Sequence, residues 1–177
     1  PAPRRSRCAY CRQAPTSRWI HFACHAYFLR DAPRQSWLEL TRTRDDDGRL
    51  EVDEIERLRL DARVVVLSAC ETAGEGGPGA NAATGEELVG MVRAFLSAGA
   101  DAVVASLWPV PDDAVPELMR AFYDELAQEP DQPALALNRA EVGLLGSGDA
   151  ASRRSHPYLA AAFTKLHTPS FFSGDQL

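Results

Sequence analysis

The sequence predicts an α/β fold with a mainly parallel sheet, and three observations support this. Residues 64–67, Val-Val-Val-Leu, are apolar at every position, which is typical of a strand covered on both faces. Two further strand-like runs, residues 19–24 and 101–107, lie on either side of it. Segments with helical periodicity separate or follow these runs. The simplest arrangement is a three-layer α/β/α sandwich.

The chain divides into three predicted segments. Residues 1–17 hold Pro1, Pro3 and Pro15 without periodicity and are predicted to form an irregular basic head. Residues 18–167 are the predicted folded domain, and residues 168–177 a flexible tail. A length of 177 residues fits one domain with one core.

Between the first two strands lies a long connection, residues 26–50. Its acidic run at residues 45–47, followed by Gly48, signals a turn, and residues 36–40 are predicted to form a short strand. Val52, Ile55 and Leu58 recur at helical spacing. They predict a short helix over residues 52–60 that leads into the strand at 63–67.

A longer helix is predicted to follow the Gly-rich residues 73–83. Thr84 and Glu87 have the spacing of a capping box, and Gly99 is placed to end the helix in the left-handed conformation. The apolar face of this helix comprises Leu88, Val89, Val92, Phe95 and Leu96.

After the strand at residues 101–107, a helix is predicted to start near Asp113. Pro116 falls in its first turn, where a missing N–H does little harm. A further helix is predicted over residues 133–145, and residues 157–166 offer a last strand or short helix. The packing stripe of the first of these helices comprises Val115, Leu118, Met119, Phe122, Tyr123 and Leu126, with Met119 assigned to the core.

Charge and composition exclude several classes of protein. Residues 1–30 carry six arginines and no acid, which leaves 13 basic against 25 acidic residues, a net charge of −12, in the rest. An acidic body argues against nucleic acid as a partner. No apolar run approaches the roughly 20 residues that span a bilayer, so we expect no membrane partner. Four unevenly placed cysteines favour a reducing, cytoplasmic compartment.

Cys70 and His25 are the candidate catalytic residues. Cys70 follows the apolar strand and is predicted at its carboxyl edge, where open α/β sheets place reacting groups. His25 ends the run at residues 19–24 in the same manner, 45 residues upstream of Cys70. A cysteine with a histidine roughly 50 residues upstream is the arrangement of caspases.

Several motifs, taken together, resemble the CHAT domain, a branch of the caspase-like cysteine peptidases. The similarity runs from about Arg18 to Leu166, with the motifs in the family's order. They are His-Phe-Ala-Cys-His at residues 21–25, Leu-Ser-Ala-Cys-Glu-Thr at 67–72, Gly-Glu-Glu-Leu at 85–88, Arg-Ala-Phe-Leu-Ser-Ala-Gly-Ala at 93–100, Ala-Ser-Leu-Trp at 105–108, and His-Pro at 156–157 followed by Ala-Ala-Ala-Phe at 160–163.

The resemblance implies a caspase-like sandwich and assigns roles to the two residues. Cys70 would be the nucleophile and His25 its imidazole partner, with the backbone N–H groups of Cys70 and Ala26 as the oxyanion hole. The family usually has Gly where this chain has Ala26, so a positive φ there would cost about 1 kcal/mol. CHAT domains usually have additional strands before the histidine motif, which leaves open a truncation at the amino-terminal side.

The resemblance further implies a cysteine endopeptidase that cleaves one or a few protein partners. It would need no cofactor and would be regulated by a helical-repeat or other sensor region, attached or separate. Two alternatives stay open: a catalytically silent interaction module or truncated remnant, and hydrolase or transferase chemistry on a small thioester or amide. The sequence names no substrate-binding residues.

Other motifs give weaker indications of function. Cys8 and Cys11 have the spacing of a zinc pair, but a second pair is missing, since His21 and Cys24 face opposite ways on a strand. We therefore expect no metal. The Gly-rich loop at residues 74–79 has no lysine for phosphates, so nucleotide binding is not expected. His21 is predicted to be a core or interface histidine whose hydrogen bonds are satisfied, and His156 and His167 are assigned structural or solvated roles.

Overall fold

A computed structural model describes residues 18–44, 46–68, 85–108, 110, 115–146 and 162–167. The predicted head at 1–17 and tail at 168–177 lie outside these residues. So do Cys70, the Gly-rich loop, Thr84 and His156. No helix within the described part of the chain is long and apolar enough to cross a membrane.

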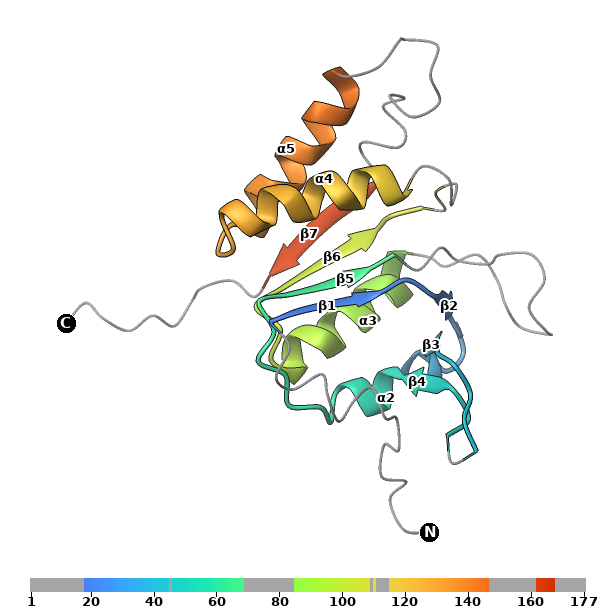
Figure 1. Cartoon of the computed structure of the whole chain (residues 1–177). Coiled ribbons are helices and arrows are strands. Elements are labelled where there is room, and N and C mark those ends of the chain that lie inside the picture. Colours follow the sequence, from blue (N-terminus) through green and yellow to red (C-terminus); the bar gives the residue numbers. More distant parts are fainter. Residues whose placement is uncertain are drawn as a thin grey trace.

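Four strands form the main sheet in the order β1-β5-β6-β7. β1, β5 and β6 run parallel, and β7 pairs antiparallel with β6 at the far edge (Figure 1). Helices connect or follow the strands, as the alternating sequence pattern predicted. The bounds are β1 Trp19–Phe22, β5 Val64–Leu67, β6 Ala102–Ser106, β7 Phe163–His167, α3 Gly85–Ala98, α4 Val115–Gln128 and α5 Pro133–Gly146.

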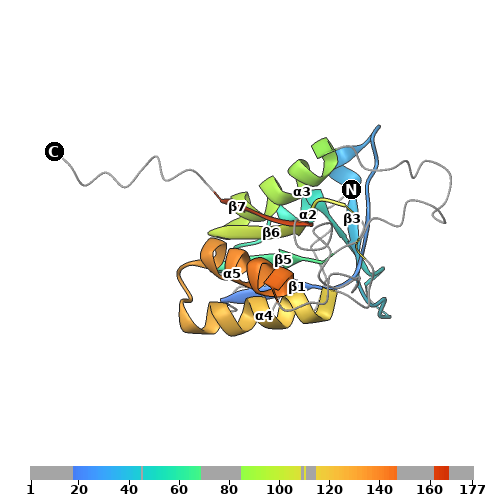
Figure 2. The ribbon, with the colours of Figure 1, turned by 90° about the horizontal axis from the view of Figure 1, so that it is seen from above.

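Helices cover both faces of this sheet, which confirms the three-layer α/β architecture (Figure 2). β5 is buried at every position because alternate residues serve different layers. Val65 and Leu67 pack in one core with α3, and Val64 and Val66 pack in the other with α4 and α5. Met119 is buried in the second core, as predicted.

A second, smaller sheet occupies the connection between β1 and β5. It is antiparallel, in the order β2-β3-β4, and the short helices η2 and α2 lie beside it. The sequence predicted a single strand here, because three-residue strands give too little alternation to recognise. The bounds are β2 His25–Tyr27, η2 Pro33–Gln35, β3 Trp37–Glu39, β4 Arg49–Glu51 and α2 Val52–Ile55.

The predicted strand over residues 19–24 is wrong at its end. β1 stops at Phe22, opposite Leu67, which is where β5 stops too. Beyond that point the chain leaves the main sheet, and His25 begins β2 instead of ending β1. The reason is packing: Ala26, Leu38 and Leu50 are buried in one row of the small sheet and join the core beneath α3.

Two helices also differ from expectation. α2 ends at Ile55 instead of Leu60, and the Leu60 N–H donates to the Ala98 carbonyl at 2.7 Å instead of continuing a helix. In α3, Val89 is 37% exposed, whereas the apolar face that is buried includes Met91, Val92 and Phe95.

Gly99 ends α3, as the sequence predicted. Its φ is +112°, and two hydrogen bonds close the helix: Gly99 N–H to Leu96 O and Ala100 N–H to Phe95 O, each at 3.1 Å. This pair of bonds is the Schellman motif. A Cβ at Gly99 would lie 2.3 Å from the Leu60 carbonyl oxygen, so both backbone angle and space require glycine.

We predict that Gly99→Ala lowers the free energy of unfolding by about 2–4 kcal/mol, because it adds both strain and a backbone clash. Urea unfolding should show a lower midpoint with an unchanged slope. Gly90→Ala is the matched control, since a Cβ there meets nothing within 4 Å. In the interior of α3 it should stabilise by about 0.5–1 kcal/mol. Equal effects of the two changes would contradict this account of Gly99.

Glu141 of α5 is a half-buried carboxyl whose Oε1 is buried and has no hydrogen-bond partner among the described residues. Burial raises the pKa of Glu141 from its ordinary value of 4.5 to about 7. Between these two values the folded state binds more protons than the unfolded state. The free energy of unfolding therefore falls as the pH rises through this window.

We expect Glu141→Gln to stabilise the protein by up to about 1 kcal/mol at pH 8, a value reduced to allow for the solvent around this side chain. At pH 4, where the carboxyl is protonated in both states, the variant and the parent should have similar stability. Thermal unfolding at the two pH values measures the difference. Asn138→Gln, at an exposed and non-ionisable residue of α5, is the control and should change the stability equally at both pH values.

Candidate active site

The segments that lead to the two predicted catalytic residues leave the main sheet side by side. Phe22 pairs with Leu67 where β1 and β5 end, and the Ser68 N–H donates to the Phe22 carbonyl at 3.0 Å. His25 lies three residues beyond Phe22. Cys70, outside the described residues, lies two residues beyond Ser68 in sequence, a stretch that spans at most about 7 Å.

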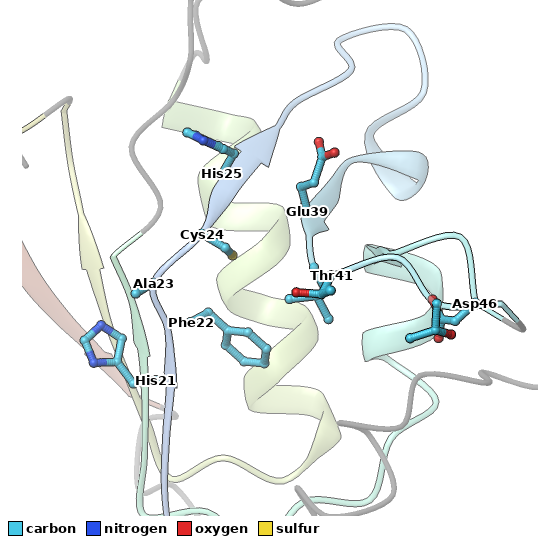
Figure 3. A pocket seen from close by; sticks show the side chains of 10 residues that line it. His21, Phe22, Ala23, Cys24, His25, Glu39, Thr41 and Asp46 are labelled. Atoms are coloured by element: carbon cyan, nitrogen blue, oxygen red, sulfur yellow. The ribbon is translucent and has the colours of Figure 1, made fainter.

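His25 is the first residue of β2, and its side chain is exposed at the rim of a groove (Figure 3). Directly opposite it on β3 is Glu39. No hydrogen bond joins the two side chains in this structure. The imidazole of His25 is therefore accessible to solvent at the rim of the groove.

Ala26 does not strain the backbone. Its φ is not positive, so the cost expected for alanine in place of glycine does not arise. Ala26 lies in a regular strand, is 1% exposed, and no described residue other than glycine has a positive φ. Antiparallel strands alternate the direction of their backbone groups. The bonds Leu40 N–H to Gly48 O and Val52 N–H to Ser36 O fix this alternation in β3 and β4. Because of this alternation, the Ala26 N–H points away from β3, on the side of β2 that forms the edge of the small sheet.

The groove has a volume of about 680 Å³. Its walls come from the chain between β1 and β2 and from the chain that follows β3 (Figure 3). Sequence reasoning did not identify this second wall, because residues 36–44 carried only a short-strand signal. No lysine or arginine is among the described residues that line the groove, which are His21, Phe22, Ala23, Cys24, His25, Glu39, Leu40, Thr41, Thr43 and Asp46.

Cys24 is half-buried beside the groove and packs against the core beneath α3. Burial, with a smaller contribution from the charge of Glu39, raises the pKa of the Cys24 thiol from 9.0 to about 11. A thiol that stays protonated is a weak nucleophile. Cys24 is therefore unsuited to the role assigned to Cys70, although it is adjacent to His25.

His21 points to the opposite side of β1 from Cys24 (Figure 3). Its Nδ1 lies 2.9 Å from the Tyr123 hydroxyl of α4, and burial lowers the pKa of the imidazole. Its Nε2 is buried without a partner among the described residues, so the expected fully satisfied histidine is confirmed only in part. His167, at the end of β7, is exposed.

The zinc alternative gains no support from the described residues. Within them, no three histidine, cysteine or acidic side chains lie close enough to hold a metal ion. Cys8 and Cys11 lie outside the described part of the chain.

We predict that iodoacetamide alkylates Cys24 of the folded protein slowly at neutral pH, where only about one thiol in ten thousand is ionised. The rate should rise about tenfold per pH unit until the pH nears 11. Peptide mass spectrometry separates this site from the other cysteines. In urea the same thiol should ionise near its ordinary pKa of 9.0. Fast alkylation of folded Cys24 at pH 7 would contradict the burial argument.

Comparison with known proteins extends this picture. The model of the CHAT domain family matches residues 7–168. Two proteins named tetratricopeptide repeat protein 28 are similar over 126 residues, 68% of this chain: that of Mus musculus is 36% identical and that of Homo sapiens 32%. The chain spans only 5% of the length of each. With most of its length matched by the family model, this chain belongs to the CHAT domain family.

Proposed function

We propose that this chain is a caspase-like cysteine endopeptidase that works through a Cys70–His25 dyad. The observation that carries the proposal is the hydrogen bond from Ser68 N–H to Phe22 O, together with the pairing of Phe22 and Leu67. It brings the chain that leads to His25 beside the chain that leads to Cys70. The accessible imidazole at the rim of the groove supports the same role.

In this mechanism the Cys70 thiolate attacks the carbonyl carbon of the scissile peptide bond. The carbon–sulfur bond forms, and the carbonyl electrons move to the oxygen. When the carbon–nitrogen bond breaks, the imidazolium of His25 gives its proton to the leaving amine. Water, deprotonated by His25, then hydrolyses the acyl-enzyme and restores the free thiol.

The oxyanion would be stabilised by the backbone N–H groups of Cys70 and Ala26. Support for Ala26 comes from the small sheet, since its N–H points away from β3 by the alternation of the ladder. The strand conformation also supports this role, because φ at Ala26 is not positive and alanine adopts it without strain. A rigid donor at this place would act without reorganisation during the reaction.

The substrate is proposed to be one or a few protein partners, not proteins in general. The similar mammalian proteins are named for tetratricopeptide repeats, which supports a helical-repeat region as the regulator of this domain. Whether such a region belongs to the same chain or to a partner, its expected role is to present the substrate to the groove.

Labelling with a peptide that carries a thiol-reactive warhead tests the dyad. Cys70→Ala should abolish labelling, and His25→Ala should slow it by about 100-fold, because the imidazole no longer stabilises the thiolate. Two matched controls remove a nearby thiol and a distant imidazole. Cys24→Ala and His167→Ala should retain labelling, since Cys24 packs against the core and His167 lies on β7.

Equal labelling of the parent, Cys70→Ala and His25→Ala would show that the dyad assignment is wrong. A folded chain that binds a protein partner but neither labels nor cleaves it would instead support the catalytically silent interaction module.

A further inference from the structure

The outer face of the small sheet carries charged and aromatic side chains in two rows, each of which crosses all three strands. One row is His25, Glu39 and Arg49, and the other begins with Tyr27 and Trp37. The opposite face is buried. In its row Glu39 thus lies between His25 on β2 and Arg49 on β4.

Arg49 does not neutralise Glu39. Its guanidinium carbon lies 4.3 Å from the centre of the Trp37 ring, a cation–π contact in the neighbouring row. Trp37 is itself stacked on Tyr27, with ring centres 4.7 Å apart and planes at 14°. No ion pair involves Glu39 among the described residues. The aromatic stack thus engages the guanidinium of Arg49, the cross-strand partner of Glu39 on β4.

His25 and Glu39 are placed to meet. The bonds that fix the ladder make them a hydrogen-bonded pair of β2 and β3, with Cα atoms about 5.5 Å apart and side chains on the same face. Rotation about side-chain bonds can bring a glutamate oxygen to an imidazole nitrogen at this spacing. In substrate-free enzymes such bonds are often long and tighten only in the complex.

We propose that Glu39 is a positioning residue, which orients His25 and stabilises its imidazolium form. The inference rests on the proposed function, because it gives His25 the third group that a dyad lacks. One ring nitrogen would face Glu39, and the other would face the thiol of Cys70. An imidazolium held in this way favours the thiolate and keeps the proton that the leaving amine needs.

Other charged groups near His25 are less suited to this role. Asp46 lies across the groove, where its Oδ1 accepts the Gly48 N–H at 2.8 Å. The Cys24 thiol is neutral, because burial and, to a smaller extent, the charge of Glu39 raise its pKa. The charge of Glu39 therefore acts on a neighbour of His25 in the groove. Glu39 is the described carboxylate that pairs directly with His25 across strands.

The direct test follows the His25 imidazole by NMR in a Cys70→Ala background, with its signals assigned by comparison with His25→Ala. Glu39→Gln should change the tautomer of His25, seen in the ¹⁵N shifts of its ring, because the carboxylate that would accept from one ring N–H is lost. Glu39→Asp, which keeps a carboxylate, should restore most of the parent pattern. Asp61→Asn removes an exposed charge ahead of β5 and should leave the ring ¹⁵N shifts unchanged.

A second measurement tests whether Glu39 and His25 affect the reactivity of Cys70. With Cys70 present, the rate of iodoacetamide alkylation of Cys70 at pH 7 should fall several-fold, on the order of threefold to tenfold, in Glu39→Gln but not in Asp61→Asn. Unchanged ring ¹⁵N shifts of His25 in Glu39→Gln overturn the inference, while His25-dependent labelling would leave the proposed function intact. Changed ring shifts together with labelling that does not depend on His25 overturn both the dyad and the positioning role.

Discussion

The parallel pairing of β1 with β5 is the constraint on which the rest of the site depends. The two strands stop at the same level, at Phe22 and Leu67, and the Ser68 N–H ties the chain to Phe22 at 3.0 Å. Parallel strands bring their carboxyl ends to one edge, so residues far apart in sequence leave the sheet together. Val64–Leu67, buried on both faces, keep this edge fixed, since neither core can accept a slip in register.

The small sheet converts that edge into a groove. Its inner row of Ala26, Leu38 and Leu50 extends the core beneath α3, so the strands are anchored by burial despite their short length. The outer face then presents His25 and Glu39 on adjacent strands. In the small sheet, side chains alternate between the two faces along each strand. The apolar residues therefore pack against the core, and His25 and Glu39 lie on the outer face.

Burial decides the chemistry of the cysteine that lines the groove. Cys24 packs against the apolar core, and its thiol is held neutral with a pKa of about 11. The CHAT family model matches residues 7–168, which include both Cys24 and the proposed nucleophile Cys70.

The sequence by itself determined the layer architecture, the long helices, the end of α3 at Gly99 and membership of the CHAT family. These are written in local patterns: continuous apolar strands, helical periodicity, a glycine where φ must be positive, and ordered motifs. Only the tertiary structure decided that β1 ends at Phe22, that His25 begins a second sheet, and that Glu39 lies opposite it on β3. Those features depend on cross-strand pairing between three-residue strands, and segments this short carry too few residues for any period to show.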